Sequence, residues 1–327
     1  MARPASASGG RACHPCRVAE AETSPDLAVM AVSLAADARA ADAVSLLEDA
    51  GIPALLLKGA SLAEWLYGSE VRGYTDADLM VSPDAHVEAE AVLARAGYTQ
   101  TLRHLHASVW EVPGQPISVD LHKRLWAAGS SPRHVWRVLW GRSSKQSIGG
   151  RDVRVLDPIA RALVVTLHHA HHDRLGQGTR RTAEDLSRTL DLLEPQDWEA
   201  VDDLAHELRA TLQFAGGLRA LPDPRAAAIA DELGLPDARL LATVVQPDAT
   251  VPLVGAIVNF RVARGPRRKL RALRNEILPP ADELRDRSAI ARHGTAGLIL
   301  AYLIAPLISL SKFPVALRHL RDMPRGT

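Results

Sequence analysis

Apolar and polar residues alternate in two short runs of the first half of the chain, residues 76–81 and residues 117–122. This alternation is typical of strands that bury one face. Because successive side chains of a strand point to opposite faces, Asp76 and Asp78 share one face of the first run. In the second run one face carries Ser118, Asp120 and His122. We therefore predict two strands that hold acids above an apolar layer.

The segments before and after the first of these strands have apolar residues at helical spacing. A helix is predicted over residues 26–50, closed by a glycine, and another over residues 84–96, introduced by a proline and also closed by a glycine. The stretch 99–122 is predicted to be a hairpin, because Pro-Gly-Gln-Pro at 113–116 is a strong turn signal between two alternating runs. If this hairpin forms, its second strand brings Asp120 next to Asp78.

From residue 158 onward the apolar spacing is helical and the strand signals fade. Helices are predicted over 159–170, 183–193, 198–214, 224–233 and 298–310. Serine, glycine and charged residues cluster at 143–157, which indicates a boundary. We expect a disordered tail over residues 1–24, an α/β (α+β) domain with a small mixed sheet and helices on one side over residues 25–150, and a C-terminal helical domain over residues 151–327.

The composition indicates a globular protein of two domains, with 47% hydrophobic and 24% charged residues in 327. A net charge of +1 argues against a nucleic-acid partner, and the basic run at 264–274 lacks interleaved aromatics. The most apolar window, 297–310, is shorter than the roughly 20 residues that span a bilayer. Membrane contact is not expected, although basic residues after this window leave peripheral contact as an alternative.

Both cysteines, Cys13 and Cys16, lie in the N-terminal stretch, so no disulfide framework is expected. A zinc site needs two further ligands, and the chain has no other cysteine. No strand and helix flank the pair as in a redox motif, so we interpret it as part of the tail. The stretch also lacks the apolar core of a signal peptide. We expect a cytoplasmic location.

Three neighbouring carboxylates repel one another, and a divalent cation relieves that repulsion. Mg²⁺ takes carboxylate oxygens together with substrate phosphates, so a phosphate-bearing substrate is expected. The alternative for an Asp-x-Asp pair is a strand that ends on a solvated loop. The segment before the pair favours the metal site: an apolar run at 54–57, a glycine turn and a helix at 62–67 let backbone N–H groups cradle phosphate.

This order of residues resembles the nucleotidyltransferase superfamily that includes DNA polymerase beta. More narrowly, it is similar to an uncharacterised nucleotidyltransferase family of bacteria. The matching segments are Leu57-Lys58-Gly59, Tyr67, Arg72, residues 76–81, Gly97-Tyr98 and residues 119–122. The resemblance is strong across residues 50–125 and fainter beyond, and it makes residues 25–150 the catalytic domain and residues 151–327 a substrate or lid domain.

The resemblance implies that Asp76, Asp78 and Asp120 are catalytic and hold two Mg²⁺ ions, or Mn²⁺. It also implies nucleotide contacts from Lys58, Gly59, Ser61, Arg72, His172 and Asp185. The serine that follows the turn glycine in the superfamily is Ala60 here, with Ser61 one place later. Alternatives remain open: Arg72 fixes the loop before the acids, Asp185 ties helices together, and His168 with His172 chelate zinc at i,i+4 spacing.

The expected function is transfer of a nucleoside monophosphate from an NTP to a hydroxyl or phosphate of a small molecule, sugar or peptide. One alternative is a catalytically inactive protein that binds nucleotide, which the Ala60 departure motivates. The other is a kinase-like phosphotransferase that moves the γ-phosphate. The sequence does not identify the acceptor or the nucleobase.

Overall fold

The structure is a computed structural model that describes residues 25–104, 106–174 and 180–236, with scattered residues between 265 and 307. The predicted tail over residues 1–24, with both cysteines, lies outside the described residues. In the C-terminal part, residues 294–304 are helical, and the remainder of the helix predicted to reach residue 310 falls largely outside the described residues.

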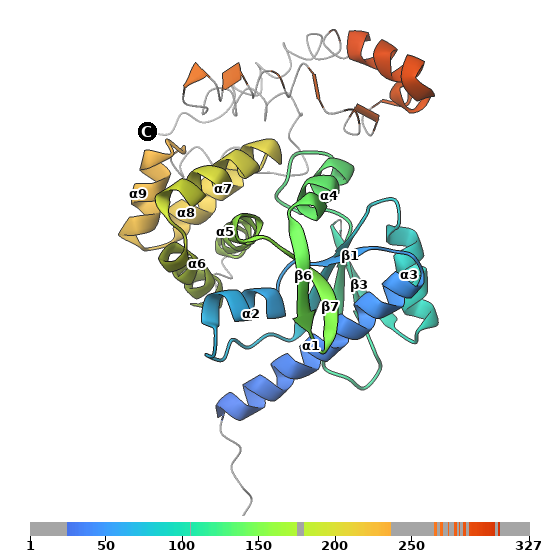
Figure 1. Cartoon of the computed structure of the whole chain (residues 1–327), viewed down its shortest axis with the longest axis vertical. Coiled ribbons are helices and arrows are strands. Elements are labelled where there is room, and N and C mark those ends of the chain that lie inside the picture. Colours follow the sequence, from blue (N-terminus) through green and yellow to red (C-terminus); the bar gives the residue numbers. More distant parts are fainter. Residues whose placement is uncertain are drawn as a thin grey trace, which may run out of the picture.

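A seven-stranded mixed sheet forms the centre of the first half (Figure 1). The strands are β1 (Ala54–Leu56), β2 (Asp76–Val81), β3 (Thr99–Arg103), β4 (Ala107–Glu111), β5 (Ser118–His122), β6 (Ser143–Ile148) and β7 (Arg151–Leu156). Their order across the sheet is β3-β4-β5-β2-β1-β7-β6. β2 pairs in parallel with β5 and β1 with β7, while the remaining pairs are antiparallel. The two acidic strands are therefore direct neighbours.

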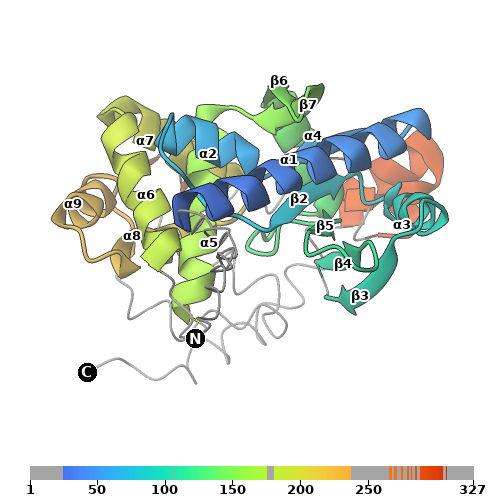
Figure 2. The ribbon, with the colours of Figure 1, turned by 90° about the horizontal axis from the view of Figure 1, so that it is seen from below.

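Helices cover both faces of the sheet. On one face Leu56 and Leu79 pack in a cluster with α1 (Pro25–Asp49) and α3 (His86–Arg95), and Figure 2 shows α1 lying along the sheet. On the other face Leu55 and Met80 pack in a cluster with α2 (Ala60–Tyr67), α4 (Pro132–Gly141) and the C-terminal helices. The expectation of helices on one side is therefore wrong. The reason is that β1 is buried on both faces and that Met80, on the acidic face of β2, is apolar and fully buried, so each face of the sheet needs cover.

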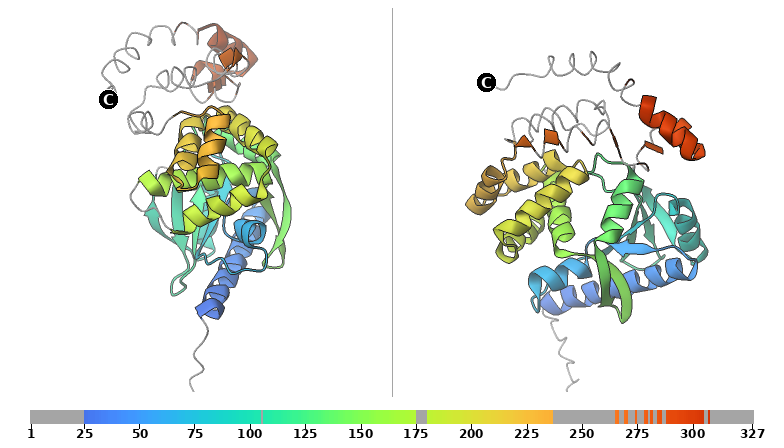
Figure 3. Two further views of the ribbon diagram at one scale, coloured as in Figure 1. Left: turned by 90° about the vertical axis from the view of Figure 1, so that its left-hand side faces the viewer. Right: turned by 45° about the horizontal axis from the view of Figure 1, so that its top comes forward.

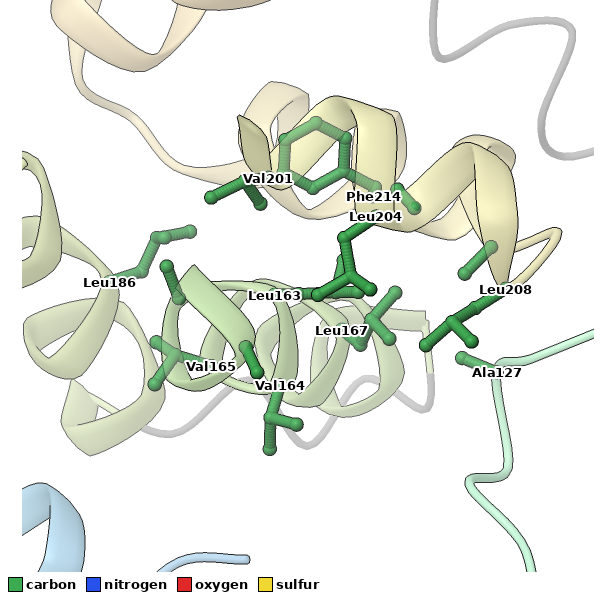
Figure 4. Close-up of a cluster of buried hydrophobic side chains, with 14 of the residues drawn as sticks. Ala127, Leu163, Val164, Val165, Leu167, Leu186, Val201, Leu204, Leu208 and Phe214 are labelled. Carbon is green, nitrogen blue, oxygen red and sulfur yellow. The ribbon is translucent and has the colours of Figure 1, made fainter. Parts of the chain in front are cut away.

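Residues 158–232 form a helical bundle, as predicted. It contains α5 (Pro158–Arg174), α6 (Arg180–Leu192), α7 (Pro195–Glu207), α8 (Thr211–Ala220) and α9 (Pro224–Glu232). Leucines of α5 pack against Phe214 of α8 and Leu204 of α7 in a buried cluster (Figure 4). Two further views show the bundle above α1 in both panels (Figure 3). Gly217 permits close approach of α8 to α5, because a Cβ there would lie 2.2 Å from the Thr166 carbonyl oxygen.

Three elements differ from the sequence predictions. The stretch 99–122 contains three strands instead of two, because a second turn follows Arg103, while the predicted turn at 113–116 is confirmed. The helix predicted over 198–214 is two helices, interrupted where Arg209 takes a positive φ of 55°. The segment 143–157, for which no strand was predicted, forms the β6–β7 hairpin, and β7 extends the sheet beside β1.

The division of the chain into domains at residue 150 stays a prediction. Among the described residues, no helix combines the length and the apolar character needed to cross a membrane.

Candidate active site

The register between β2 and β5 brings two predicted acids together. Asp78 is the direct partner of Asp120, and Asp76 is the partner of Ser118. Residues paired in this way point to the same face of the sheet, so the carboxylates gather on the face that the helical bundle covers. Ligand atoms of Asp78, Asp120 and His122 all lie within 4.8 Å of one another. Asp76 is half-buried on the same face, two residues before Asp78.

His122 belongs to this cluster, although the sequence analysis did not name it as a site residue. Its imidazole Nε2 lies 3.0 Å from Asp78 Oδ1, and the side chain is buried. The signal was present in the sequence, because alternation placed His122 on the same face as Asp120. What alternation left open was whether the ring turns toward the acids.

Lys58 lies inside the acidic cluster. The backbone N–H of Leu57 donates to the Asp78 carbonyl oxygen at 2.9 Å, which holds the end of β1 beside the acids. The Lys58 ammonium Nζ lies 3.1 Å from Asp78 Oδ1. Burial opposes the charged ammonium, but Asp78, followed by Asp76 and Asp120, outweighs it and raises the pKa of Lys58 above its usual value. Lys58 is therefore the cation that balances Asp78 within the chain.

The three carboxylates titrate differently. Burial works to raise the pKa of Asp78, yet Lys58 and the hydrogen bond from His122 hold that pKa below its usual value. The charge of Asp78, and after it burial, raises the pKa of Asp76. Burial, together with the charge of Asp78, raises the pKa of Asp120 to about 6. One firmly ionised carboxylate thus lies beside two that ionise less readily, which is the charge pattern that a divalent cation relieves.

The donor set fits a divalent metal ion. Carboxylate oxygens are the ligands of Mg²⁺ and Mn²⁺, and an imidazole nitrogen adds a ligand common in transition-metal sites. The residues that converge are Asp78, Asp120 and His122. Asp76 lies two residues before Asp78 on the same face of β2, and its expected role as a metal ligand stays a prediction. A metal that binds Asp78 takes over the charge balance that Lys58 provides.

The glycine turn lies between this cluster and α2. Gly59 has a positive φ of 71°, a conformation that favours glycine, and a Cβ there would lie 3.6 Å from the Asp76 carbonyl oxygen. Ser61 is buried, and its hydroxyl donates to the Lys58 carbonyl oxygen at 3.4 Å. No side chain caps the first turn of α2, which leaves backbone N–H groups at that end for an anion.

Arg72 and Asp185 bind each other. The guanidinium donates from Nε at 2.9 Å and from Nη2 at 2.7 Å to the two carboxylate oxygens, and the Tyr67 hydroxyl donates to Oδ1 at 2.9 Å. Both Arg72 and Asp185 are buried. The contact joins the loop before β2 to α6. This agrees with the alternatives in which Arg72 fixes the loop before the acids and Asp185 ties helices together. Their expected nucleotide contacts stay a prediction.

Two histidines of α5 line the other side of Lys58. His168 Nε2 lies 3.4 Å from the Lys58 Nζ and 3.0 Å from His172 Nε2. Burial, and then the charge of Lys58, lower the pKa of both histidines, so their rings are neutral near pH 7. Among the described residues, the two rings are not part of the three-residue cluster whose atoms converge for a metal. His168 thus lies between His172 and Lys58, and the expected nucleotide contact of His172 stays a prediction.

The chain has distant likenesses among solved structures. No curated protein matches the chain. The solved structure of the antibiotic-resistance factor ANT(2'')-Ia is 16% identical, with a TM-score of 0.39, and the match covers 56% of this chain and 95% of that one. An antigenic nucleotidyltransferase-like protein from Paracoccidioides brasiliensis is 14% identical, with a TM-score of 0.32, over 55% of this chain and 92% of that one. Both likenesses are distant.

The family comparison is more extensive. The sequence model described as "Uncharacterised nucleotidyltransferase" matches residues 8–222, which is more than half of the 327 residues and includes every acid of the cluster. This match confirms the family and the class of enzyme that the motifs around Gly59, Asp76 and Asp120 predicted. The chain therefore belongs to this uncharacterised nucleotidyltransferase family.

Proposed function

We propose that the protein transfers a nucleoside monophosphate from an NTP to a hydroxyl or phosphate group of a small molecule or peptide, with Mg²⁺ as cofactor. The observation that carries this proposal is the pairing of Asp78 with Asp120 on adjacent parallel strands, with Asp76 on the same face. Divalent ions at these acids would neutralise the triphosphate and lower the pKa of the acceptor group. No nucleic-acid acceptor is expected.

Each residue then has a role in the reaction. Asp76, Asp78 and Asp120 would hold the metal ions, and Asp120 would also accept the proton that the acceptor hydroxyl loses. Lys58 and the backbone N–H groups at the start of α2 bind phosphate oxygens. A new bond forms between the acceptor oxygen and the α-phosphorus, the bond to the β-phosphate oxygen breaks, and pyrophosphate leaves.

Product analysis tests this proposal. The protein is incubated with Mg²⁺ and NTPs labelled at the α- or the γ-phosphate, together with a panel of sugars, antibiotics and peptides. We expect α-label on an acceptor together with pyrophosphate, lost in Asp78→Asn and retained in Asp84→Asn, an exposed acid just after β2. ADP and γ-label on the acceptor would instead identify a phosphotransferase.

A binding protein without turnover is the second candidate. The Lys58 ammonium already balances Asp78 within the chain, and the Ser61 hydroxyl is directed to the Lys58 carbonyl oxygen. In that case NTP binds in the presence of Mg²⁺, but no acceptor in the panel leads to pyrophosphate release.

A further inference from the structure

The imidazole of His122 is part of the acidic cluster, and its role goes beyond the carboxylate chemistry proposed above. We propose that His122 is a metal ligand through Nε2, so that one ion is bound by two carboxylate oxygens and one nitrogen. This site prefers Mn²⁺ and neighbouring transition ions to Mg²⁺. The inference deepens the proposed function, because it concerns the cofactor of the same site.

The position of the ring on β5 supports ligation. His122 lies two residues after Asp120 and therefore on the same face of the strand. In the β2–β5 register His122 is the partner of Met80. The Met80–His122 pair is therefore the next pair after Asp78–Asp120 that points to the same face of the sheet. The residue is only 7% exposed, and the 3.0 Å between Nε2 and Asp78 Oδ1 shows that this nitrogen faces the cluster.

The distances match a shared metal ion. When metal–ligand bonds are about 2.1 Å long, adjacent ligands of an octahedral ion are about 3.0 Å apart and opposite ligands about 4.2 Å apart. His122 Nε2 and Asp78 Oδ1 are separated by 3.0 Å, the spacing of adjacent ligands. All ligand atoms of the cluster lie within 4.8 Å of one another, so one ion reaches all three with small side-chain adjustments.

Packing orients the ring for this role. The His106 ring stacks on the His122 ring with centroids 5.8 Å apart, and the His104 ring stacks on His106 at 5.4 Å. His122 Nδ1 is buried and makes no hydrogen bond to the residues that the structure describes. The orientation of Nε2 toward Asp78 thus depends on the stacked neighbour and on the strand register.

The nitrogen determines the choice of ion. Mg²⁺ is a hard cation that favours oxygen ligands and keeps several waters, whereas imidazole suits zinc, copper, iron and nickel ions, and the affinity of a mixed nitrogen and oxygen site rises along the transition series that begins with Mn²⁺. A purely carboxylate site gains little from replacing Mg²⁺ by Mn²⁺. Exchanging one oxygen ligand for the His122 nitrogen shifts the balance toward Mn²⁺.

Electron paramagnetic resonance of bound Mn²⁺ tests the assignment, because a directly bonded nitrogen produces ¹⁴N modulation of the manganese echo. The full chain is titrated with Mn²⁺ alone. We expect ¹⁴N modulation in the wild type and in His293→Gln, an exposed histidine of the C-terminal part. Modulation should disappear in His122→Gln and His122→Asn, with Mn²⁺ affinity lower by at least about tenfold and Mg²⁺ affinity changed less.

The outcomes separate this inference from the proposed function. Absence of Mn²⁺ binding, binding without ¹⁴N modulation, or modulation that persists in both His122 variants would overturn the ligand assignment. Circular dichroism of both variants checks that they fold. If ¹⁴N modulation is observed but no nucleotide is transferred, the transfer reaction is rejected and the His122 ligand assignment is kept. If nucleotide is transferred but no ¹⁴N modulation is observed, the ligand assignment is rejected and the transfer reaction is kept.

Discussion

The buried pair of Arg72 and Asp185 provides a quantitative test of how the site is supported. The relative exposure of these residues is 8% and 2%, and two charged hydrogen bonds of 2.9 and 2.7 Å join them. Removing one partner of a buried pair leaves an uncompensated charge and typically costs about 3–5 kcal/mol. We expect a loss of that size in the free energy of unfolding for Arg72→Met and for Asp185→Leu.

The double variant Arg72→Met/Asp185→Leu removes both charges and leaves neither uncompensated. We expect its loss to be smaller than the sum of the two single losses by at least about 2 kcal/mol, which is within the usual range for residues in one network. Urea unfolding followed by tryptophan fluorescence measures these values, and Trp198 is a buried reporter in the bundle.

The exposed pair Arg133 and Asp84 is the matched control. Because solvent screens an exposed pair, its removal should change the unfolding free energy by no more than about 1 kcal/mol. Single losses at Arg72 and Asp185 as small as those of the control, or strict additivity in the double variant, would refute the view that this contact fixes the loop before β2 to α6.

Three other predictions follow from the site and its support. The pKa of Asp120 is raised to about 6, so the folded chain binds the carboxyl proton more tightly than the unfolded chain does. The ionised carboxylate of Asp120 therefore lowers the stability of the fold at pH 7, and this loss becomes smaller as the pH falls through 6. Asp120→Asn should therefore stabilise the metal-free protein more at pH 7 than at pH 5 in urea unfolding, and an equal effect at both values contradicts this. Lys58→Met should tighten Mn²⁺ binding and weaken NTP binding by calorimetry, because it removes the cation at Asp78, and weakening of both would be the opposite result. Gly217→Ala should lower the unfolding free energy by about 1–3 kcal/mol, because the added methyl group overlaps the Thr166 carbonyl. Gly141→Ala is the control and should cost nothing, because its methyl group meets open space. Equal effects of the two substitutions would disprove the tight contact.

Alternation was enough to predict the centre of the site. It identified β2 and β5 as strands and placed Asp76 and Asp78 on one face. The turn at 113–116 sets the register of β4 with β5, whereas the pairing of Asp78 with Asp120 comes from the parallel packing of β5 beside β2. Local signals sufficed because a strand with one polar and one apolar face has a fixed period of two.

Other features could not be predicted, for identifiable physical reasons. β6 is an edge strand of polar, largely exposed residues, so its sequence carries no alternating apolar pattern. The break between α7 and α8 occurs at Arg209, without a glycine or proline to mark it. The contacts of Lys58 with His168 and of Arg72 with Asp185 join residues more than a hundred positions apart, and only the packing of the bundle against the sheet decides them.

Binding of a non-hydrolysable NTP analogue tests most directly whether the carboxylates form a metal-dependent nucleotide site. Isothermal titration calorimetry with and without Mg²⁺ or Mn²⁺ is carried out on the wild type, Asp76→Asn, Asp78→Asn and the control Asp84→Asn. We predict metal-dependent binding in the wild type and the control, and a loss of at least about tenfold in the two site variants, as is usual when metal coordination is disturbed. Binding that is independent of metal, or that survives both site substitutions unchanged, would contradict the account.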